Sequence, residues 1–189
     1  MREIALHLLD IAENSAAAES RYISIEIHED LYNDLLTACV TDDGRGMDAQ
    51  TAQQVQDPFY TSRTTRNVGL GIPLLKLAAE MAEGGLSLQS EPGKGTRVEV
   101  YFRHSHIDRM PLGDISATFL TALISHPKIH WTFIYRVTDG NRSSRDFVFD
   151  DAELKTALGD LSLTEPEVLT FVRGMIEENI EALALQPVM

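Results

Sequence analysis

Asp10 and Asn14 stand four residues apart in a segment whose apolar residues recur at helical spacing. Residues 3 to 18 are therefore expected to form an amphipathic helix, with Asp10, Asn14 and His7 on its polar face. An Asn amide oxygen can ligate Mg²⁺, and a carboxylate can orient an attacking water. The alternative for this pair is a solvated helix face, and His7 is expected to be an ordinary polar surface residue.

A second acid follows an apolar run. Residues 35 to 41 predict a buried strand, and Asp42-Asp-Gly44-Arg-Gly46-Met47 comes directly after it. Gly44 and Gly46 permit positive φ angles and the close approach of a ligand, so Asp42 held there could accept a hydrogen bond from an exocyclic amine. The alternative is an ordinary hairpin turn, because Asp-Gly is a favoured turn dipeptide.

A glycine pair, Gly69-Leu70-Gly71, opens a segment of helical periodicity from residue 70 to 82. Unpaired N–H groups and the positive end of the helix dipole would face this turn, and phosphate is their natural occupant. Such a pair is weak evidence by itself. The three features in this order together predict a site for a nucleotide with Mg²⁺.

These features, with two further motifs, resemble those of the GHKL superfamily, which contains gyrase, heat-shock chaperone, histidine kinase and mismatch-repair ATPase domains. The run from residue 70 to 102 looks most like the histidine-kinase ATP domain. The matching segments are Asp10-Ile-Ala-Glu-Asn-Ser (N box), Asp42-Asp-Gly-Arg-Gly-Met (first glycine box), Pro58-Phe-Tyr-Thr-Ser-Arg63 (lid), Val68-Gly-Leu-Gly-Ile72 (second glycine box) and Gly93-Lys-Gly-Thr96 (third glycine motif).

The resemblance covers about the first hundred residues. It implies an α/β (α+β) two-layer sandwich, in which helices cover one side of a mixed sheet and ATP binds between the helices and a flexible lid. It also implies that Asn14 holds Mg²⁺, that Asp42 binds the adenine amine and that Thr96 supports Asp42. The other residues carried over are Gly44 and Gly46 for the adenine pocket, Gly69 and Gly71 for the phosphates, Arg63 for the γ-phosphate, and Met47 and Leu70 as further nucleotide-binding residues.

Two departures from the family bear on activity. Many hydrolytic members place a Glu where this chain has Asp10, so Asp10 is the candidate catalytic base with a shorter reach to water. Histidine kinases carry their phosphoacceptor on an upstream dimerisation helix, and only nine residues precede Asp10, so self-phosphorylation of that kind is not expected.

The expected function is Mg-ATP binding with slow hydrolysis or phosphoryl transfer to a separate protein, in a regulatory role. The alternative is a non-catalytic switch, in which ATP orders the lid from residue 57 to 68 and so changes a protein-binding surface.

Two domains are expected, residues 1–103 and residues 111–189, because periodicity is lost between His104 and Pro111. In the first, strands are predicted at 22–28, 35–41, 86–89 and 96–102, with a short helix capped by Asp48. In the second, a helix at 114–125, strands at 129–137 and 145–149, and capping boxes at Asp150 and Thr164 predict an αββαα unit. This unit is expected to recognise a partner protein or to assemble a homodimer.

Composition limits the classes of partner and the cellular location that are expected. The chain has 189 residues and a formal net charge of −13, which argues against a nucleic-acid or anionic-membrane partner. Its single cysteine, Cys39, lies in an apolar run, so a disulfide framework is excluded and a cytoplasmic location is favoured. Neither a signal peptide nor an apolar span of some twenty residues is found, so no membrane attachment is expected.

Overall fold

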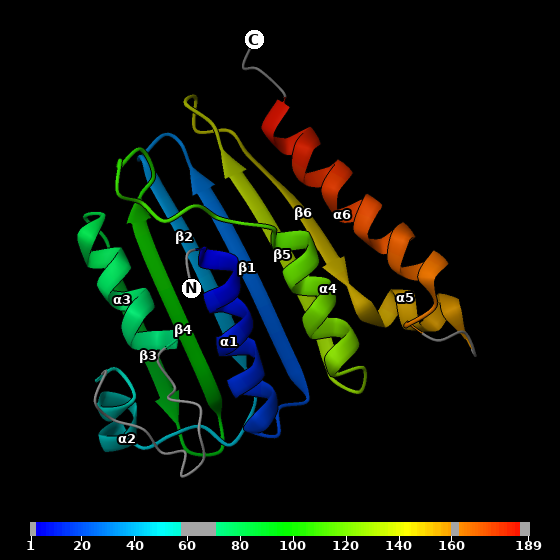
Figure 1. The fold of residues 1–189 in the computed structure, drawn as a ribbon, viewed down its shortest axis with the longest axis horizontal. Coiled ribbons are helices and arrows are strands. Elements are labelled where there is room, and N and C mark those ends of the chain that lie inside the picture. The colour runs from blue at the N-terminus through cyan, green and yellow to red at the C-terminus, as the bar shows by residue number, and fades with distance from the viewer. Residues whose placement is uncertain (1–2, 58–70, 160–162, 186–189) are drawn as a thin grey trace.

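A computed structural model describes residues 3–57, 71–159 and 163–185 (Figure 1). Along these ranges the helices and strands follow the order that the sequence patterns predict. They are α1 (Ile4–Ala17), β1 (Tyr22–Asp30), β2 (Leu35–Asp42), α2 (Ala49–Gln54), α3 (Gly71–Met81), β3 (Gly85–Glu91), β4 (Gly95–Arg103), α4 (Ile115–Ser125), β5 (His130–Thr138), β6 (Ser144–Asp150), α5 (Asp151–Leu158) and α6 (Pro166–Leu185).

The strands form one six-stranded sheet in the order β3-β4-β2-β1-β5-β6. Neighbouring strands run antiparallel except β1 and β5, which are parallel. Helices α1, α3 and α4 lie across the same face of the sheet (Figure 1). The expected mixed sheet with helices layered on one side is therefore confirmed.

The core lies between these two layers. Alternate residues of β1, Ile23, Ile25 and Ile27, are buried beneath the helices, as the period of two predicts. The ring of Phe119 on α4 packs against those of Trp131 and Phe133 on β5, with centroids 6.4 and 5.2 Å away. Aromatic burial of this kind fixes α4 to the β5 side of the sheet.

Three aspartates begin helices in the way the sequence suggests. Asp48 accepts a hydrogen bond from the Thr51 N–H (2.7 Å) at the start of α2, and Asp114 accepts one from the Ala117 N–H (2.8 Å) at the start of α4. Asp150 caps α5. These caps satisfy N–H groups that have no partner inside the first helical turn.

The two parts of the chain share the sheet. β5 pairs with β1 from His130 opposite Tyr22 to Thr138 opposite Asp30, and their side chains join one apolar cluster. The division into an ATP-binding domain of residues 1–103 and a partner-binding or dimerisation domain of residues 111–189 stays a prediction. None of the helices in the described ranges combines the length and apolar character needed to cross a bilayer.

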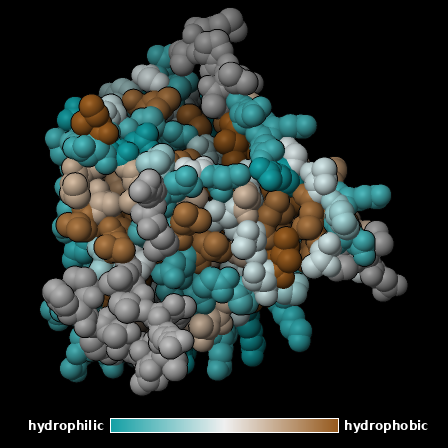
Figure 2. All heavy atoms as spheres, in the orientation of Figure 1, coloured by the Kyte–Doolittle hydropathy of each residue, from teal (hydrophilic) through white to brown (hydrophobic). Residues whose placement is uncertain are grey.

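The surface of α3 is apolar as well as its buried side. Figure 2 shows brown, apolar side chains among the polar ones on the helix-bearing face of the molecule. On α3, Leu74, Leu77 and Met81 are exposed, whereas Leu75 and Ala79 are buried. The helix is thus hydrophobic on most sides, as its sequence predicts.

Candidate functional site

The carboxylate of Asp42 is held by three donors at the end of β2. Its Oδ2 accepts a hydrogen bond from Ser15 Oγ at 2.6 Å, and its Oδ1 accepts the N–H groups of Gly44 (2.9 Å) and Thr96 (3.2 Å). Asp42 is only 7% exposed. Thr96 thus contacts this acid through its backbone, and an acceptor fixed on both oxygens presents its remaining lone pairs in a set direction.

The glycines around Asp42 make room for protein backbone. At Gly46, where φ is 63°, a Cβ would lie 1.9 Å from the carbonyl oxygen of Glu91. At Gly95, where φ is 95°, a Cβ would lie 1.9 Å from the carbonyl oxygen of Asp42. The turn after β2 and the β3–β4 hairpin therefore interlock, and a side chain at either glycine would separate them.

Ser90 connects the same two turns. Its Oγ accepts the Met47 N–H (2.8 Å) and donates to the carbonyl oxygen of Gly95 (3.0 Å). Because this hydroxyl has a single proton, the hydroxyl of Thr96, 2.9 Å away, donates to Ser90. Met47 and Thr96 are thereby fixed on either side of one serine.

The middle of α1 meets the start of α3. Gly71 is the first described residue of α3, and a Cβ there would lie 1.9 Å from Asp10 Oδ2. Asp10 Oδ2 is buried and has no hydrogen-bond partner among the described residues. A carboxylate in this position is favoured by the positive end of the helix dipole.

His7 lies beside this contact and is fully buried, so its prediction as a surface residue was wrong. Its Nδ1 donates to the carbonyl oxygen of Gly71 at 3.0 Å, since a carbonyl can only accept. Burial lowers the pKa of His7, although this hydrogen bond acts in the opposite sense. At His7 the polar face of α1 is covered by α3, so the alternative of a solvated face does not hold there, whereas Asp10 and Asn14 are half-buried.

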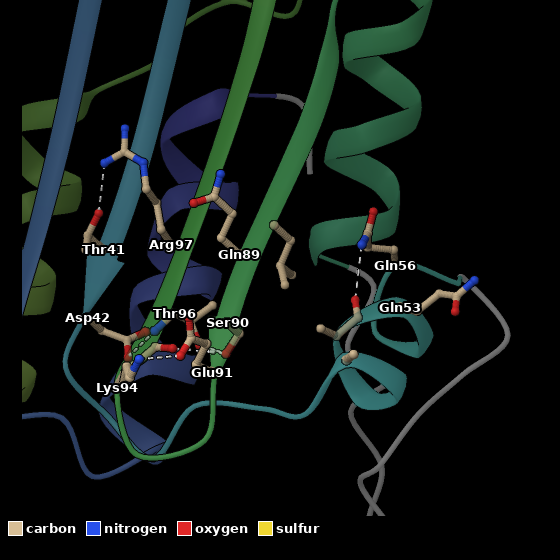
Figure 3. Close-up of a pocket in the computed structure, with 14 residues that line it drawn as sticks. Thr41, Asp42, Gln53, Gln56, Gln89, Ser90, Glu91, Lys94, Thr96 and Arg97 are labelled. Carbon is tan, nitrogen blue, oxygen red and sulfur yellow. Dashed lines mark hydrogen bonds and ion pairs between the residues drawn. The ribbon is translucent and has the colours of Figure 1, made fainter.

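A cavity of about 620 Å³ opens beside Asp42 (Figure 3). One wall is α2, and the other is formed by the adjoining ends of β2, β3 and β4. Asp42 and Thr96 both line it, together with Ser90. The volume is that of a typical small-molecule site.

The structure places the remaining predicted residues as follows. Asn14 is half-buried on α1, immediately before Ser15. Gly44 lies where a Cβ would come within 2.5 Å of Ser20 Oγ, so it too is tightly packed. Arg63, Gly69, Leu70 and the lid from residue 58 lie outside the described residues.

Sequence reasoning missed Ser15, Ser90 and His7. The sequence could have indicated Ser15. It follows Asn14 directly, and successive side chains of a helix point about 100° apart, so Ser15 lies beside the polar face that carries Asn14. Ser90 gave no local signal, since its role depends on the pairing of Ser90 with Thr96 across two strands.

Comparison with known proteins places this site in a family. Residues 1–106 match the family of histidine kinase-, DNA gyrase B-, and HSP90-like ATPases. The chain is 31% identical over 123 residues to a non-motile and phage-resistance protein of Caulobacter vibrioides, covering 62% of this chain and 15% of that one.

Two kinases are also similar to this chain. Sensor protein kinase FleS of Pseudomonas aeruginosa is 36% identical over 89 residues, which is 47% of this chain and 22% of that protein. Cell-division control histidine kinase PdhS of Brucella ovis is 30% identical over 115 residues, which is 54% of this chain and 11% of that protein. The chain thus corresponds to a small part of each relative.

The matched residues contain α1, the turn after β2, the start of α3 and the β3–β4 hairpin, which are the segments that build the site. Because the match spans more than half of the sequence, the chain belongs to the family of histidine kinase-, DNA gyrase B- and HSP90-like ATPases.

Proposed function

We propose that the protein binds Mg-ATP where α1, the turn after β2 and the start of α3 meet. The observation that carries this proposal is the double attachment of α1. Ser15 holds Asp42, and Asp10 lies against Gly71. Residues 10 and 15 are about 7.5 Å apart along a helix axis. The single helix α1 therefore sets the separation between Asp42, which would bind adenine, and Gly71, which would bind the phosphates.

The described residues fit such a ligand. Asp42 is a fixed acceptor for the adenine amine, and with Thr96 it lines a cavity of ligand size that borders α2 and includes no residue of α1 or α3. Asn14, one residue from Ser15, would ligate Mg²⁺ through its amide oxygen. The N-terminus of α3 favours phosphate, and Met47 and Thr96 would flank the base. When bound, Mg²⁺ would neutralise charge on the phosphates.

The activity is slow hydrolysis of ATP to ADP and phosphate, or phosphoryl transfer to a separate protein in a regulatory role. In hydrolysis Asp10 would accept the proton of the attacking water. One observation favours the non-catalytic switch as a second candidate: Asp10 Oδ2 is enclosed by protein against Gly71, which leaves only the other oxygen to meet a water.

We further propose that the αββαα part of the chain contacts a partner protein or forms a homodimer in a cytoplasmic setting. Its support is the acidic charge, which disfavours nucleic acid and anionic membranes. Light scattering of the purified chain, with and without Mg-ATP, separates the dimer from the monomer.

The test of nucleotide binding uses Asp42→Asn, with Asp43→Asn as its matched control. The Asn side chain can keep Oδ1 as acceptor for Gly44 and Thr96, but it turns the second acceptor into a donor. Asp43 stands next in the chain, and its carboxylate accepts the N–H groups of Arg21 and Tyr22 instead.

The wild-type chain should gain about 2.7 kcal/mol of stability at an ATP concentration one hundred times its Kd. Asp42→Asn should weaken ATP binding by about 1 to 3 kcal/mol and reduce the preference for ATP over GTP, whereas Asp43→Asn should not. Absence of any ATP-dependent stabilisation in the wild type would refute the proposal. Phosphate release that survives in Asp10→Asn would show that Asp10 is not the base.

A further inference from the structure

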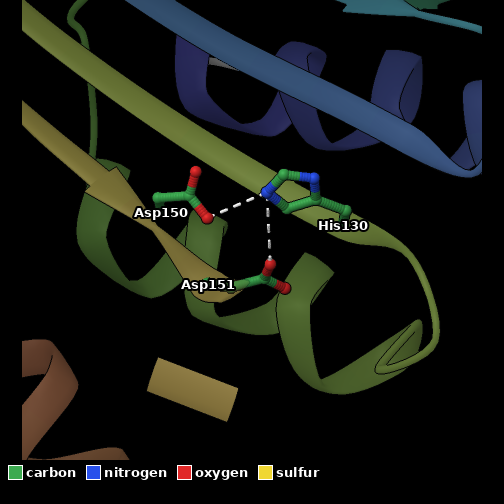
Figure 4. Close-up of side chains that lie close together, drawn as sticks. All are labelled: His130, Asp150 and Asp151. Atoms are coloured by element: carbon green, nitrogen blue, oxygen red, sulfur yellow. Dashed lines mark hydrogen bonds and ion pairs between the residues drawn. The ribbon is translucent and has the colours of Figure 1, made fainter. Parts of the chain in front are cut away.

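His130, Asp150 and Asp151 converge at the edge of the sheet away from α3 (Figure 4). His130 is the first residue of β5, Asp150 is the last of β6, and Asp151 is the first of α5. Because β5 and β6 are antiparallel, the start of one strand lies beside the end of the other. The histidine nitrogen and one oxygen from each carboxylate all lie within 4.8 Å of one another.

Two distances define the cluster. His130 Nε2 is 2.8 Å from Asp150 Oδ1 and 3.9 Å from Asp151 Oδ1. In a tetrahedral zinc site with bonds of about 2.0 to 2.1 Å, two ligand atoms lie roughly 3.4 Å apart. One of the two distances here is shorter than this value and the other is longer. A small movement of each side chain would therefore place all three atoms around one ion.

Asp151 is the unusual member, because its side chain is completely buried. Its Oδ2 is 2.6 Å from Lys155 Nζ, and Lys155 also donates to the carbonyl oxygen of Ile129 at 2.7 Å. Asp151 Oδ1 has no hydrogen-bond partner among the described residues and points toward His130. A buried carboxylate oxygen without a donor is costly unless a cation reaches it.

The net charge of the cluster also favours a bound cation. Two carboxylates face one ammonium group, so a neutral His130 leaves one negative charge to be balanced. A divalent ion bound with His130 as a neutral ligand would offset this charge and leave the cluster with one positive charge. Asp150 Oδ1 also accepts the Ala152 N–H at 2.8 Å, which fixes this carboxylate as the cap of α5.

We propose that His130, Asp150 and Asp151 form a Zn²⁺ site, with Lys155 as the counter-ion of Asp151. Imidazole nitrogen with carboxylate oxygens is a ligand set that suits zinc, whereas Mg²⁺ and Ca²⁺ prefer oxygen alone. The side chains of His130 and Asp150 are 42% and 37% exposed, so water can complete the coordination. The site is separate from the proposed nucleotide site and does not depend on it.

The experiment is a calorimetric titration of the tag-free full chain with zinc chloride, without nucleotide. His130→Gln retains a hydrogen-bond donor near Asp150 but offers zinc no imidazole, and Asp150→Asn keeps a good helix cap while removing the charge. His126→Gln is the matched control, since among the described residues His126 pairs with one carboxylate, that of Glu13, at 2.9 Å. Circular dichroism melts identify any variant that does not fold.

The wild type and His126→Gln should each bind one zinc ion per chain with micromolar affinity or better. His130→Gln and Asp150→Asn should each bind it at least tenfold more weakly, and excess Mg²⁺ should not displace it. The proposal is overturned if the wild type binds no zinc, if both site variants bind it as tightly as the wild type, or if His126→Gln loses as much affinity as they do. Asp42→Asn should bind zinc as tightly as the wild type does. A failure of the nucleotide-binding proposal can therefore be distinguished from a failure of the zinc proposal.

Discussion

Replacing Gly71 by Ala tests whether the contact between α1 and α3 is as close as the structure shows. The added Cβ would lie 1.9 Å from Asp10 Oδ2, 2.9 Å from its Cγ and 3.3 Å from its Cβ. A Cβ atom essentially never lies closer than about 3.0 Å to a non-bonded heavy atom, so this oxygen would have to retreat by at least about 1.1 Å. Oδ2 itself is buried, although Asp10 as a whole is half-buried, so the retreat has to carry this oxygen away from α3.

The expected cost follows from these distances. Overpacking of this kind destabilises proteins by about 1 to 3 kcal/mol, and Ala returns at most about 1 kcal/mol over Gly in a helix. Gly71→Ala should therefore lower the free energy of unfolding by up to about 2 kcal/mol. It should also weaken ATP binding, because it moves the first turn of α3.

Gly174→Ala is the matched control, because Gly174 lies within α6 and a Cβ there would meet nothing within 4 Å. It should stabilise the chain by about 0.5 to 1 kcal/mol through helix propensity alone. The assay is urea unfolding of both variants and of the wild type, followed by circular dichroism.

A double-mutant cycle identifies the clashing partner. In an Asp10→Ala background the carboxylate is gone, so Gly71→Ala should cost little or nothing there. The coupling energy between the two substitutions should then equal the overpacking cost, about 1 to 3 kcal/mol. An equal cost in both backgrounds would show that Asp10 does not limit the space at residue 71.

Three further predictions concern other parts of the chain. Burial raises the pKa of the Cys39 thiol to about 11, so the native protein should react slowly with a thiol reagent at pH 8. The stability that this neutral thiol contributes should decline as the pH rises above the thiol's unfolded pKa of about 8.5. Hydrogen bonds from Ser105 and Arg103 lower the pKa of Asp34 to about 2, so its stabilising effect should persist above pH 4 and disappear as the pH falls through about 2; NMR titration of its carboxyl group measures the midpoint. A chain ending at residue 106 exposes the edge of β1 and the side of α1 that α4 covers, so it should lack the cooperative melting of the full chain; cooperative calorimetric melting of this fragment would instead support the division into two domains.

Local patterns predicted the elements well because each element's burial follows its own periodicity. The pattern of residues 129–137 predicted a strand, and in β5 the alternate residues Trp131, Phe133 and Tyr135 are buried. Periodicity says nothing about which strands pair when their sequence separation is large. The parallel pairing of β5 with β1, which merges the C-terminal elements into the first sheet, was therefore not predicted.

In the candidate site too, the sequence pattern did not show which distant residues contact one another. Asp42 and Thr96 were assigned by resemblance, and the structure brings them to one cavity. His7 was misjudged because a polar helix face covered by another helix has the same sequence pattern as one covered by water. Only the position of Gly71 reveals the difference, since its carbonyl oxygen accepts the buried imidazole proton.

This burial gives α1 a role beyond carrying Asp10 and Asn14. The helix is bound at one end through His7 to the first turn of α3, and near its other end through Ser15 to the turn after β2. Any ligand that moved α3 would have to move His7 as well, and a buried imidazole cannot give up its hydrogen bond to Gly71 without a replacement. Changes at the glycine turn are therefore expected to reach Asp42 through one rigid helix, which gives the switch proposed above a physical path within the described residues.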